Sequence, residues 1–234
     1  PAYFTEGVDN NTNEYFRRTD CRYVENIRVT SSKNYISKYV NEEVKFRISL
    51  TASTAPTADG SIRSSSDANW ILYRLTDVML MRAEAEIELA GEVVAEQGLT
   101  EEQKKHYENA WTSIMAVWRR AHNQRTVSRD TLVFTDYANS RRSMEDLVLE
   151  ERQRELMFEG KRWYDLVRFS RRDKDNSRMI AKVLPKFKQD QSSIRIRLAS
   201  QDALYWPYNR EEMKVNKYLI QNPAYKTGEN WEKQ

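Results

Sequence analysis

The chain has 234 residues, of which 39% are hydrophobic and 11% aromatic, a composition typical of a packed globular protein. It carries 38 lysine and arginine residues against 35 aspartate and glutamate residues, which leaves a net charge of only +3. Even residues 141–172, the most charged region, balance nine basic groups with seven acidic ones. This balance disfavours an electrostatic surface for nucleic acid, and we expect no nucleic-acid partner.

The counts of special residues exclude several kinds of site. Cys21 is the single cysteine, so neither an internal disulfide nor a Cys-x-x-Cys metal or redox site can form. The two histidines, His106 and His122, are expected to face solvent and belong to neither a Glu-x-x-His nor an HExxH motif, so we expect no metal and no cofactor. The sequence contains no run of eighteen apolar residues, and its first residues lack the features of a signal peptide.

Residues 1–69 are rich in serine, threonine, asparagine and aspartate, and we expect a loop-rich segment there. Within it, residues 44–50 (VKFRISL) alternate apolar and polar side chains, as a half-buried strand does. Residues 194–198 (IRIRL) alternate in the same way. The two segments therefore predict a minor β-sheet.

Residues 70–90 change to helical periodicity, with apolar side chains on two faces of the predicted helix. Arg82 and Glu86 lie within one apolar face, and Glu84 lies on the other. We therefore expect this helix to be covered nearly all round and to end at Gly91.

A second amphipathic helix is predicted over residues 101–122, where aromatic and aliphatic residues recur at intervals of three and four. Together with residues 70–90 it makes a helical hairpin, the unit that stacks in repeat proteins. Residues 70–170 are thus expected to be helical.

A third helix is predicted over residues 143–159, beginning at Ser143 and ending at Gly160. Its main apolar face includes Glu151 and Glu155 at the centre, and further apolar residues lie on the opposite side. The helix should therefore be sandwiched between neighbours, with these two carboxylates directed inward.

Residues 171–234 are first polar and then aromatic. Pro207 and Pro223 prevent a regular helix across those two points. We expect an extended aromatic tail that lies along the surface of the helices.

Three stretches together resemble one family. They are residues 72–91 (LYRLTDVMLMRAEAEIELAG), residues 150–169 (EERQRELMFEGKRWYDLVRF) and residues 204–225 (LYWPYNREEMKVNKYLIQNPAY). Their order and spacing are similar to those of SusD/RagB proteins over nearly the whole chain. The departures are Asn209 and Ala224, which replace a proline and a glycine of the closing motif and affect only local turns.

The resemblance implies a mostly α-helical fold of tetratricopeptide-like hairpins with long loops and a minor β-sheet. It implies a non-enzymatic, lipid-anchored protein at the outer-membrane surface that captures oligosaccharide, or in some members peptide, for a TonB-dependent transporter. It also implies that residues 1–234 form a C-terminal domain, whose N-terminal half and lipoprotein signal lie outside this sequence. A protein-interaction scaffold is the alternative, because helical hairpins commonly bind protein partners.

Two interpretations of Glu151 and Glu155 remain open. Carboxylates at i and i+4 have Cβ atoms about 5–6 Å apart, and a retaining glycosidase needs carboxyl groups about 5–5.5 Å apart. Arginines flank both residues, however, and a buried carboxylate beside arginine stays ionised, unlike a general acid. We favour a structural ion-pair network over hydrolysis. Its predicted members are Arg82, Glu84, Glu86, Glu151, Glu155 and Arg162.

Aromatic residues are the best candidates for ligand contact, because sugar rings stack on tryptophan or tyrosine while amides bind the hydroxyls. We prefer the loop-rich first third, since binding residues often lie on loops. The predicted ligand-binding residues are Tyr15, Tyr23, Tyr35, Tyr39, Asn69 and Trp70. Packing of these rings onto the helices is the alternative. Helical spacing assigns Trp111, Trp118 and Trp163 to the core.

Overall fold

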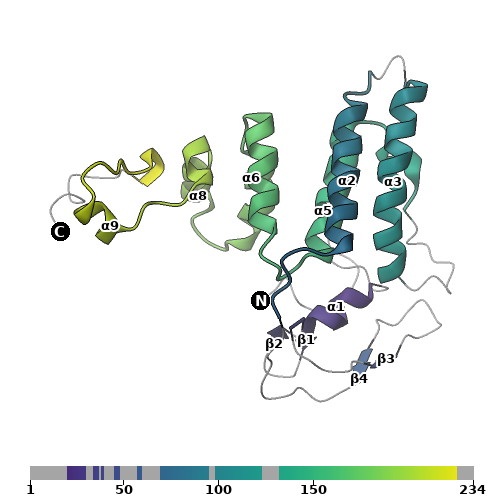
Figure 1. Ribbon diagram of the computed structural model, residues 1–234, viewed down its shortest axis with the longest axis horizontal. Coiled ribbons are helices and arrows are strands. Elements are labelled where there is room, and N and C mark those ends of the chain that lie inside the picture. The colour runs from purple at the N-terminus through teal and green to yellow at the C-terminus, as the bar shows by residue number, and fades with distance from the viewer. Residues whose placement is uncertain are drawn as a thin grey trace. The chain divides into compact units, whose positions relative to one another are not determined.

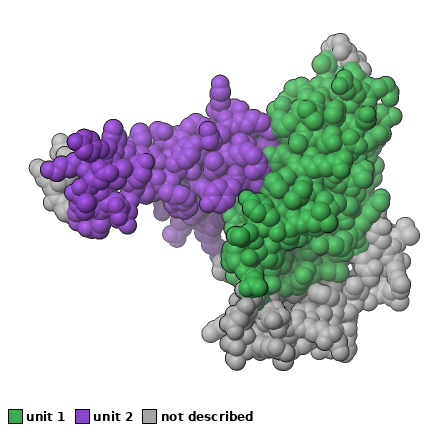
Figure 2. Space-filling model, in the orientation of Figure 1, with its two compact units in different colours: residues 1–161 green, residues 162–234 purple. Residues whose placement is uncertain are grey.

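The computed structural model divides into two compact units, residues 1–161 and residues 162–234 (Figure 2). The residues it describes are 20–29, 34–36, 38–39, 45–47, 57–59, 69–94, 98–122 and 132–225 (Figure 1). Helices dominate these residues, and the prediction of a mostly α-helical fold with minor β-structure is confirmed.

A helical hairpin forms the centre of the first unit. Helix α2 (Leu75–Ala90) and helix α3 (Glu101–Ala121) lie side by side (Figure 1). Gly91 ends α2 with a φ of 71°, a conformation that glycine adopts without strain. Thr100 begins α3 through a capping box, because its hydroxyl accepts a hydrogen bond from the Gln103 backbone while the Gln103 side chain accepts one from the Thr100 backbone.

Helix α5 (Arg141–Glu155) packs against both helices of the hairpin, and the short helix α4 (Phe134–Tyr137) precedes it. The Ser140 hydroxyl caps α5 by accepting a hydrogen bond from the Ser143 backbone at 3.1 Å. The helix thus begins and ends earlier than the predicted residues 143–159. Its apolar residues are buried on both sides, as expected of a sandwiched helix.

The core of the first unit lies between α2, α3 and α5. Its largest members with almost no exposed surface are Leu80, Ile87, Tyr107, Ile114, Met144 and Val148. Trp118 is buried, whereas Trp111 is only half-buried and packs edge-on against Phe134.

One apolar face of α2 is not covered, contrary to the expectation for residues 70–90. Leu75, Val78 and Leu89 follow one side of the helix and are 73%, 50% and 70% exposed. The opposite side, which carries Leu80 and Ile87, is the one that α3 and α5 bury. The prediction of a helix covered all round is therefore wrong for α2 within this chain.

The first third contributes helix α1 (Cys21–Asn26) and two small hairpins. Strand β1 (Ile27–Val29) pairs antiparallel with β2 (Asn34–Ile36), with Ile27 opposite Ile36. Strand β3 (Lys45–Arg47) pairs antiparallel with β4 (Thr57–Asp59). Within the strand predicted over residues 44–50, residues 45–47 form β3, whose partner is β4.

The second unit is helical where an extended tail was predicted. It contains α6 (Arg162–Asp173), α7 (Ser177–Val183), α8 (Gln191–Leu198) and α9 (Arg210–Val215). Single-turn 3₁₀ helices cover Leu184–Lys186, Gln201–Leu204 and Pro223–Tyr225. The side chains packed in its interior include Leu166, Phe169, Met179, Ile180 and Leu204.

The strand predicted over residues 194–198 is wrong, because these residues belong to α8. An alternation of five residues is too short to separate a strand from an exposed helix. Tertiary contacts decide the outcome: the Gln191 side chain donates hydrogen bonds to the Leu184 and Phe187 carbonyls, and the Asn176 amide donates to the Leu198 carbonyl. These bonds fix both ends of the helix on neighbouring segments.

Candidate functional site

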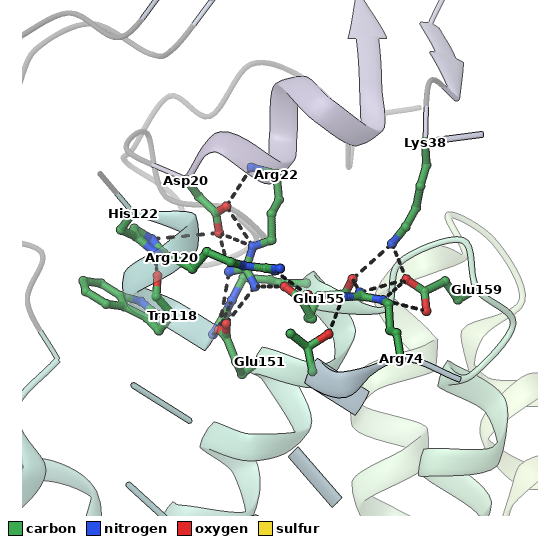
Figure 3. A network of polar contacts seen from close by, with 12 residues as sticks. Asp20, Arg22, Lys38, Arg74, Trp118, Arg120, His122, Glu151, Glu155 and Glu159 are labelled. Carbon is green, nitrogen blue, oxygen red and sulfur yellow. Dashed lines mark hydrogen bonds and ion pairs between the residues drawn. The ribbon is translucent and has the colours of Figure 1, made fainter. Parts of the chain in front are cut away.

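Three carboxylates follow one another at intervals of four residues along α5 and the turn after it. Glu151, Glu155 and Glu159 are 0%, 2% and 3% exposed, and cations surround them (Figure 3). We call Glu151, Glu155, Glu159 and their ion-pair partners the acidic cluster. Buried carboxylates require such partners, because burying an unpaired charge is costly.

Arg22 of α1 joins the first two carboxylates of the acidic cluster. Its guanidinium lies 2.7 Å from Glu151, 3.0 Å from Glu155 and 2.7 Å from Asp20. Arg154 forms a second ion pair with Glu151 at 2.9 Å. Burial by itself would lower the pKa of Arg22, but the negative charges of Glu151 and Asp20 raise that pKa above its ordinary value. Arg22 therefore stays charged and anchors α1 to α5.

Glu155 is the most heavily paired residue of the cluster. It contacts Arg22, Arg74 at the start of α2, and Arg120 of α3, the last at 2.5 Å. Burial opposes ionisation of this carboxyl, yet its hydrogen bond and charge interactions with the three arginines lower the pKa of Glu155 to about 2. The Glu155 side chain thus links α5 to α1, to the start of α2 and to α3.

Glu159 lies in the turn after α5 and binds two cations. Arg74 approaches it at 2.8 Å, and the Lys38 ammonium lies 2.6 Å from Oε1. Lys38 also donates a hydrogen bond to the Glu155 carbonyl at 3.1 Å. Burial lowers the pKa of Lys38, and the pairing with Glu159 opposes this shift.

The surrounding arginines hold the pKa of Glu155 well below its ordinary value, and arginine and lysine side chains pair with all three carboxylates. A general acid needs the opposite, a carboxyl group whose pKa is raised. The geometry supports a structural role for Glu151 and Glu155, in which they bind the loop-rich segment to the helices.

A buried histidine borders the acidic cluster. The His122 ring stacks on Trp118 with centroids 4.0 Å apart, and its Nδ1 lies 2.9 Å from the Trp118 carbonyl oxygen. Its Nε2 lies 3.9 Å from Asp20. Burial lowers the pKa of His122, which favours the neutral ring. The expectation that both histidines face solvent is wrong, because His122 is 4% exposed and His106 is half-buried in contact with Glu86.

A stacked aromatic pair, half-buried Tyr39 and exposed Trp70, lies next to Glu159. The rings of Tyr39 and Trp70 stack with centroids 4.9 Å apart and an interplanar angle of 12°. The Tyr39 hydroxyl donates a hydrogen bond to the Phe158 carbonyl at 3.2 Å. Trp70 is 60% exposed, and the neighbouring Asn69 is also exposed. We call Tyr39 and Trp70 the aromatic pair.

A third aromatic ring, that of Tyr73, follows Trp70 along the chain. Tyr73 is 73% exposed, and the Lys161 ammonium lies 4.0 Å from the centre of its ring. Lys161 also donates a hydrogen bond to the Leu72 carbonyl and lies 3.5 Å from Asp77. The segment 69–74 therefore presents two aromatic rings and one amide to solvent, while charged groups hold it at Leu72 and Arg74.

The structure brings three of the predicted ligand-binding residues together, namely Tyr39, Asn69 and Trp70. Tyr15 lies outside the described residues. Tyr23 and Tyr35 are described by their backbone alone, in α1 and β2.

The predicted ion-pair residues lie on α2, α5 and α6. Arg82 and Glu86 lie 3.8 Å apart on α2, where Glu86 also contacts His106 of α3 at 2.7 Å. Glu84 is half-buried on the same helix. Arg162 begins α6 in the second unit.

Several members of the acidic cluster were missed. They are Arg22, Lys38, Arg120 and Glu159. The spacing of Glu159, four residues after Glu155, was a usable signal, because it continues the same helical face. Nothing local to Arg22 or Lys38 indicates which carboxylate, more than a hundred positions away, they will meet.

Within the described part of the chain, no three histidine, cysteine, aspartate or glutamate residues are grouped so that they could hold a metal ion. Among the helices in that part, none combines the length and apolar composition that crossing a bilayer requires.

These features define a helical protein whose loops are bound to its helices by buried ion pairs and carry exposed aromatic rings. The model of the SusD family matches residues 4–225, so the chain belongs to the SusD family. It is 27% identical over 162 residues to SusD-like protein P38 of Formosa agariphila, which is 69% of this chain and 26% of that protein. The chain thus spans about a quarter of the length of this relative.

A solved structure is also similar. The crystal structure of a SusD superfamily protein from Bacteroides thetaiotaomicron, at 1.50 Å resolution, matches 90% of this chain and 36% of its own chain. The sequence identity is 25% and the TM-score is 0.47. The family resemblance read from the sequence motifs is confirmed by the family match.

Proposed function

We propose that this chain is part of a nutrient-binding protein that captures oligosaccharide without cleaving it. Membership of the SusD family supports a binding role, and the observation that carries the sugar assignment is Trp70. Its indole is 60% exposed yet backed by the Tyr39 ring, so it offers a rigid apolar surface to solvent. A sugar ring can stack on such a surface while an amide such as Asn69 binds its hydroxyls.

The cellular role follows from the same family assignment. We propose that the complete protein is lipid-anchored at the outer-membrane surface and delivers its ligand to a TonB-dependent transporter. Co-purification of the complete protein with such a transporter from outer membranes is the expected result. Recovery of the protein in the soluble cytoplasmic fraction would contradict this location.

Calorimetry with a panel of hexasaccharides (maltose-, laminaribiose-, xylose- and mannose-based) tests the binding function. We expect Trp70→Ala to weaken binding by about 30-fold or more, as removal of a central aromatic contact does. Trp206→Ala is the matched control, because Trp206 is 75% exposed but belongs to the second unit. Equal affinities for wild type and Trp70→Ala would contradict the assignment.

The same experiment separates the alternatives. Binding of a tryptic peptide mixture with no response to the four sugars would indicate a peptide-binding member of the family. No response to either would favour an interaction scaffold. Release of reducing ends from a hexasaccharide would show hydrolysis, which the lowered pKa of Glu155 argues against.

A further inference from the structure

We propose that Glu159 is a positioning residue for the aromatic pair, so that the turn after α5 sets the geometry of the surface offered to sugar. This inference rests on the proposed function, because it assigns a task to a residue that does not itself touch the ligand. It concerns residues 156–161, the turn between α5 and the end of the first unit.

The segment that carries Tyr39 is fixed to this turn at two consecutive residues. Lys38 forms the ion pair with Glu159 at 2.6 Å and donates to the Glu155 carbonyl at 3.1 Å. Tyr39 donates from its hydroxyl to the Phe158 carbonyl at 3.2 Å. These three contacts determine where the Tyr39 ring lies relative to the turn.

The segment that carries Trp70 is fixed to the same turn from its other end. Arg74 donates from Nε to both Glu159 oxygens, at 3.0 and 3.2 Å. Lys161 donates to the Leu72 carbonyl at 2.5 Å. Both segments therefore meet at Glu159, whose carboxylate lies between Lys38 and Arg74 (Figure 3).

The turn at residues 156–161 lies against the indole of Trp70. Gly160 has a φ of 74°, in the left-handed region that glycine adopts without cost. A Cβ atom at Gly160 would lie 3.9 Å from Cζ2 of Trp70, so the indole edge borders the turn at van der Waals distance. Trp70 is thus supported by Tyr39 and bordered by the backbone of residue 160.

Glu159 differs in this respect from Glu151, and it shares Arg74 with Glu155. The cations paired with Glu151 are Arg22 and Arg154, which lie on α1 and α5. Both ion-pair partners of Glu159 lie within four residues of a ring of the aromatic pair. Charge-assisted bonds in a buried site are strong and directional, so they can hold both rings in place before ligand arrives.

The test is Glu159→Gln, which keeps the shape of the side chain and removes its charge. The matched control is Glu145→Gln, because Glu145 is equally buried on α5 and pairs with Arg141 at 3.0 Å, away from the turn. Both proteins are labelled with 5-fluorotryptophan, and the ¹⁹F resonance of Trp70 is assigned by its loss in Trp70→Phe. Hexasaccharide affinity is measured in parallel with the panel described above.

We expect Glu159→Gln to move and broaden the Trp70 resonance and to weaken hexasaccharide binding by about tenfold. Glu145→Gln should change neither property, although it should lower the stability of the chain. An unchanged Trp70 resonance in Glu159→Gln, or an equal change in Glu145→Gln, would overturn the proposal. If Glu159→Gln does not fold, Lys38→Met removes one partner and should move the resonance in the same direction.

The two proposals fail separately. If no hexasaccharide binds the wild-type chain, the sugar assignment fails, but the fluorine spectrum still decides whether Glu159 positions Trp70. If sugar binds and requires Trp70 while Glu159→Gln leaves affinity and spectrum unchanged, the positioning role fails and the binding function stands.

Discussion

Arg22 and Glu155 are 133 positions apart in the chain, and their side chains meet at 3.0 Å where each is almost completely buried. The contact joins α1, in the loop-rich first third, to the end of α5. A pair of this kind adds little net stability compared with a well-packed apolar core, but breaking it leaves a buried charge without a partner. Removal of either partner should therefore destabilise the fold by more than the loss of one contact would.

Glu155→Ala should lower the free energy of unfolding by about 3–5 kcal/mol, because it removes a buried carboxylate and leaves the charges of Arg22 and Arg74 only partly compensated. Urea unfolding followed by circular dichroism measures this loss. Glu108→Ala serves as the control, since Glu108 is exposed on α3 and should cost less than about 0.5 kcal/mol. Similar losses in the two variants would show that the acidic cluster has no special structural role.

Acid should destabilise the chain in two steps. Burial lowers the pKa of His122, so the unfolded chain binds this proton first and stability falls as the pH drops below about 6.5. The pKa of Glu155 is lowered from 4.5 to about 2, so its contribution is complete above pH 4.5 and is lost as the pH falls towards 2. Urea unfolding between pH 8 and pH 3 measures both. In the variant His122→Phe, the loss of stability below about pH 6.5 should be absent and the loss towards pH 2 should remain. A dependence of stability on pH equal to that of the wild type would refute the assignment to His122.

Trp70, which precedes α2, should be more accessible than Trp163, which lies at the start of α6. Trp70 is 60% exposed, whereas Trp163 is half-buried and lies 5.8 Å from Trp206 between ring centroids. Acrylamide quenching of single-tryptophan variants should therefore be stronger for Trp70, and weakest for Trp118, which is buried. Equal quenching of Trp70 and Trp163 would contradict this order.

The uncovered face of α2 should cause association. Leu75, Val78 and Leu89 are at least half exposed along one side of the helix, and apolar patches of this kind usually mark contact surfaces. We expect the 234-residue chain to self-associate in sedimentation experiments, or to bind an N-terminal fragment of a longer family member. Val78→Lys with Leu89→Lys should reduce the association, whereas Val215→Lys, exposed in the second unit, should not. A monodisperse wild-type monomer would disprove the expectation.

Local signals were sufficient for some elements of the fold. Helix α3 occupies residues 101–121 against a predicted 101–122, because both its apolar spacing and its cap at Thr100 lie within the segment itself. Helix α2 begins at residue 75 instead of 70. Arg74 has extended backbone geometry while its side chain reaches Glu155 and Glu159, and periodicity cannot reveal such a distant contact.

The candidate site was predictable to a similar degree. The inward direction of Glu151 and Glu155 follows from their place on the apolar face of a helix, and the exposure of Trp70 follows from its place beside a polar segment. The ion-pair partners of these carboxylates lie in distant segments. No sequence feature near Lys38 indicates that it pairs with Glu159. Which of two apolar faces a helix buries was also undetermined, because α2 carries one on each side.

Cys21 opens α1 immediately before Arg22, and it is the only thiol in the 234 residues. It is half-buried, so a thiol reagent should modify it faster when α1 lifts away from α5 than when α1 is docked. The rate at which Cys21 is modified therefore reports how often α1 separates from α5. Labelling rates read by mass spectrometry would give the free energy of local opening directly, with no engineered probe and without unfolding the rest of the molecule.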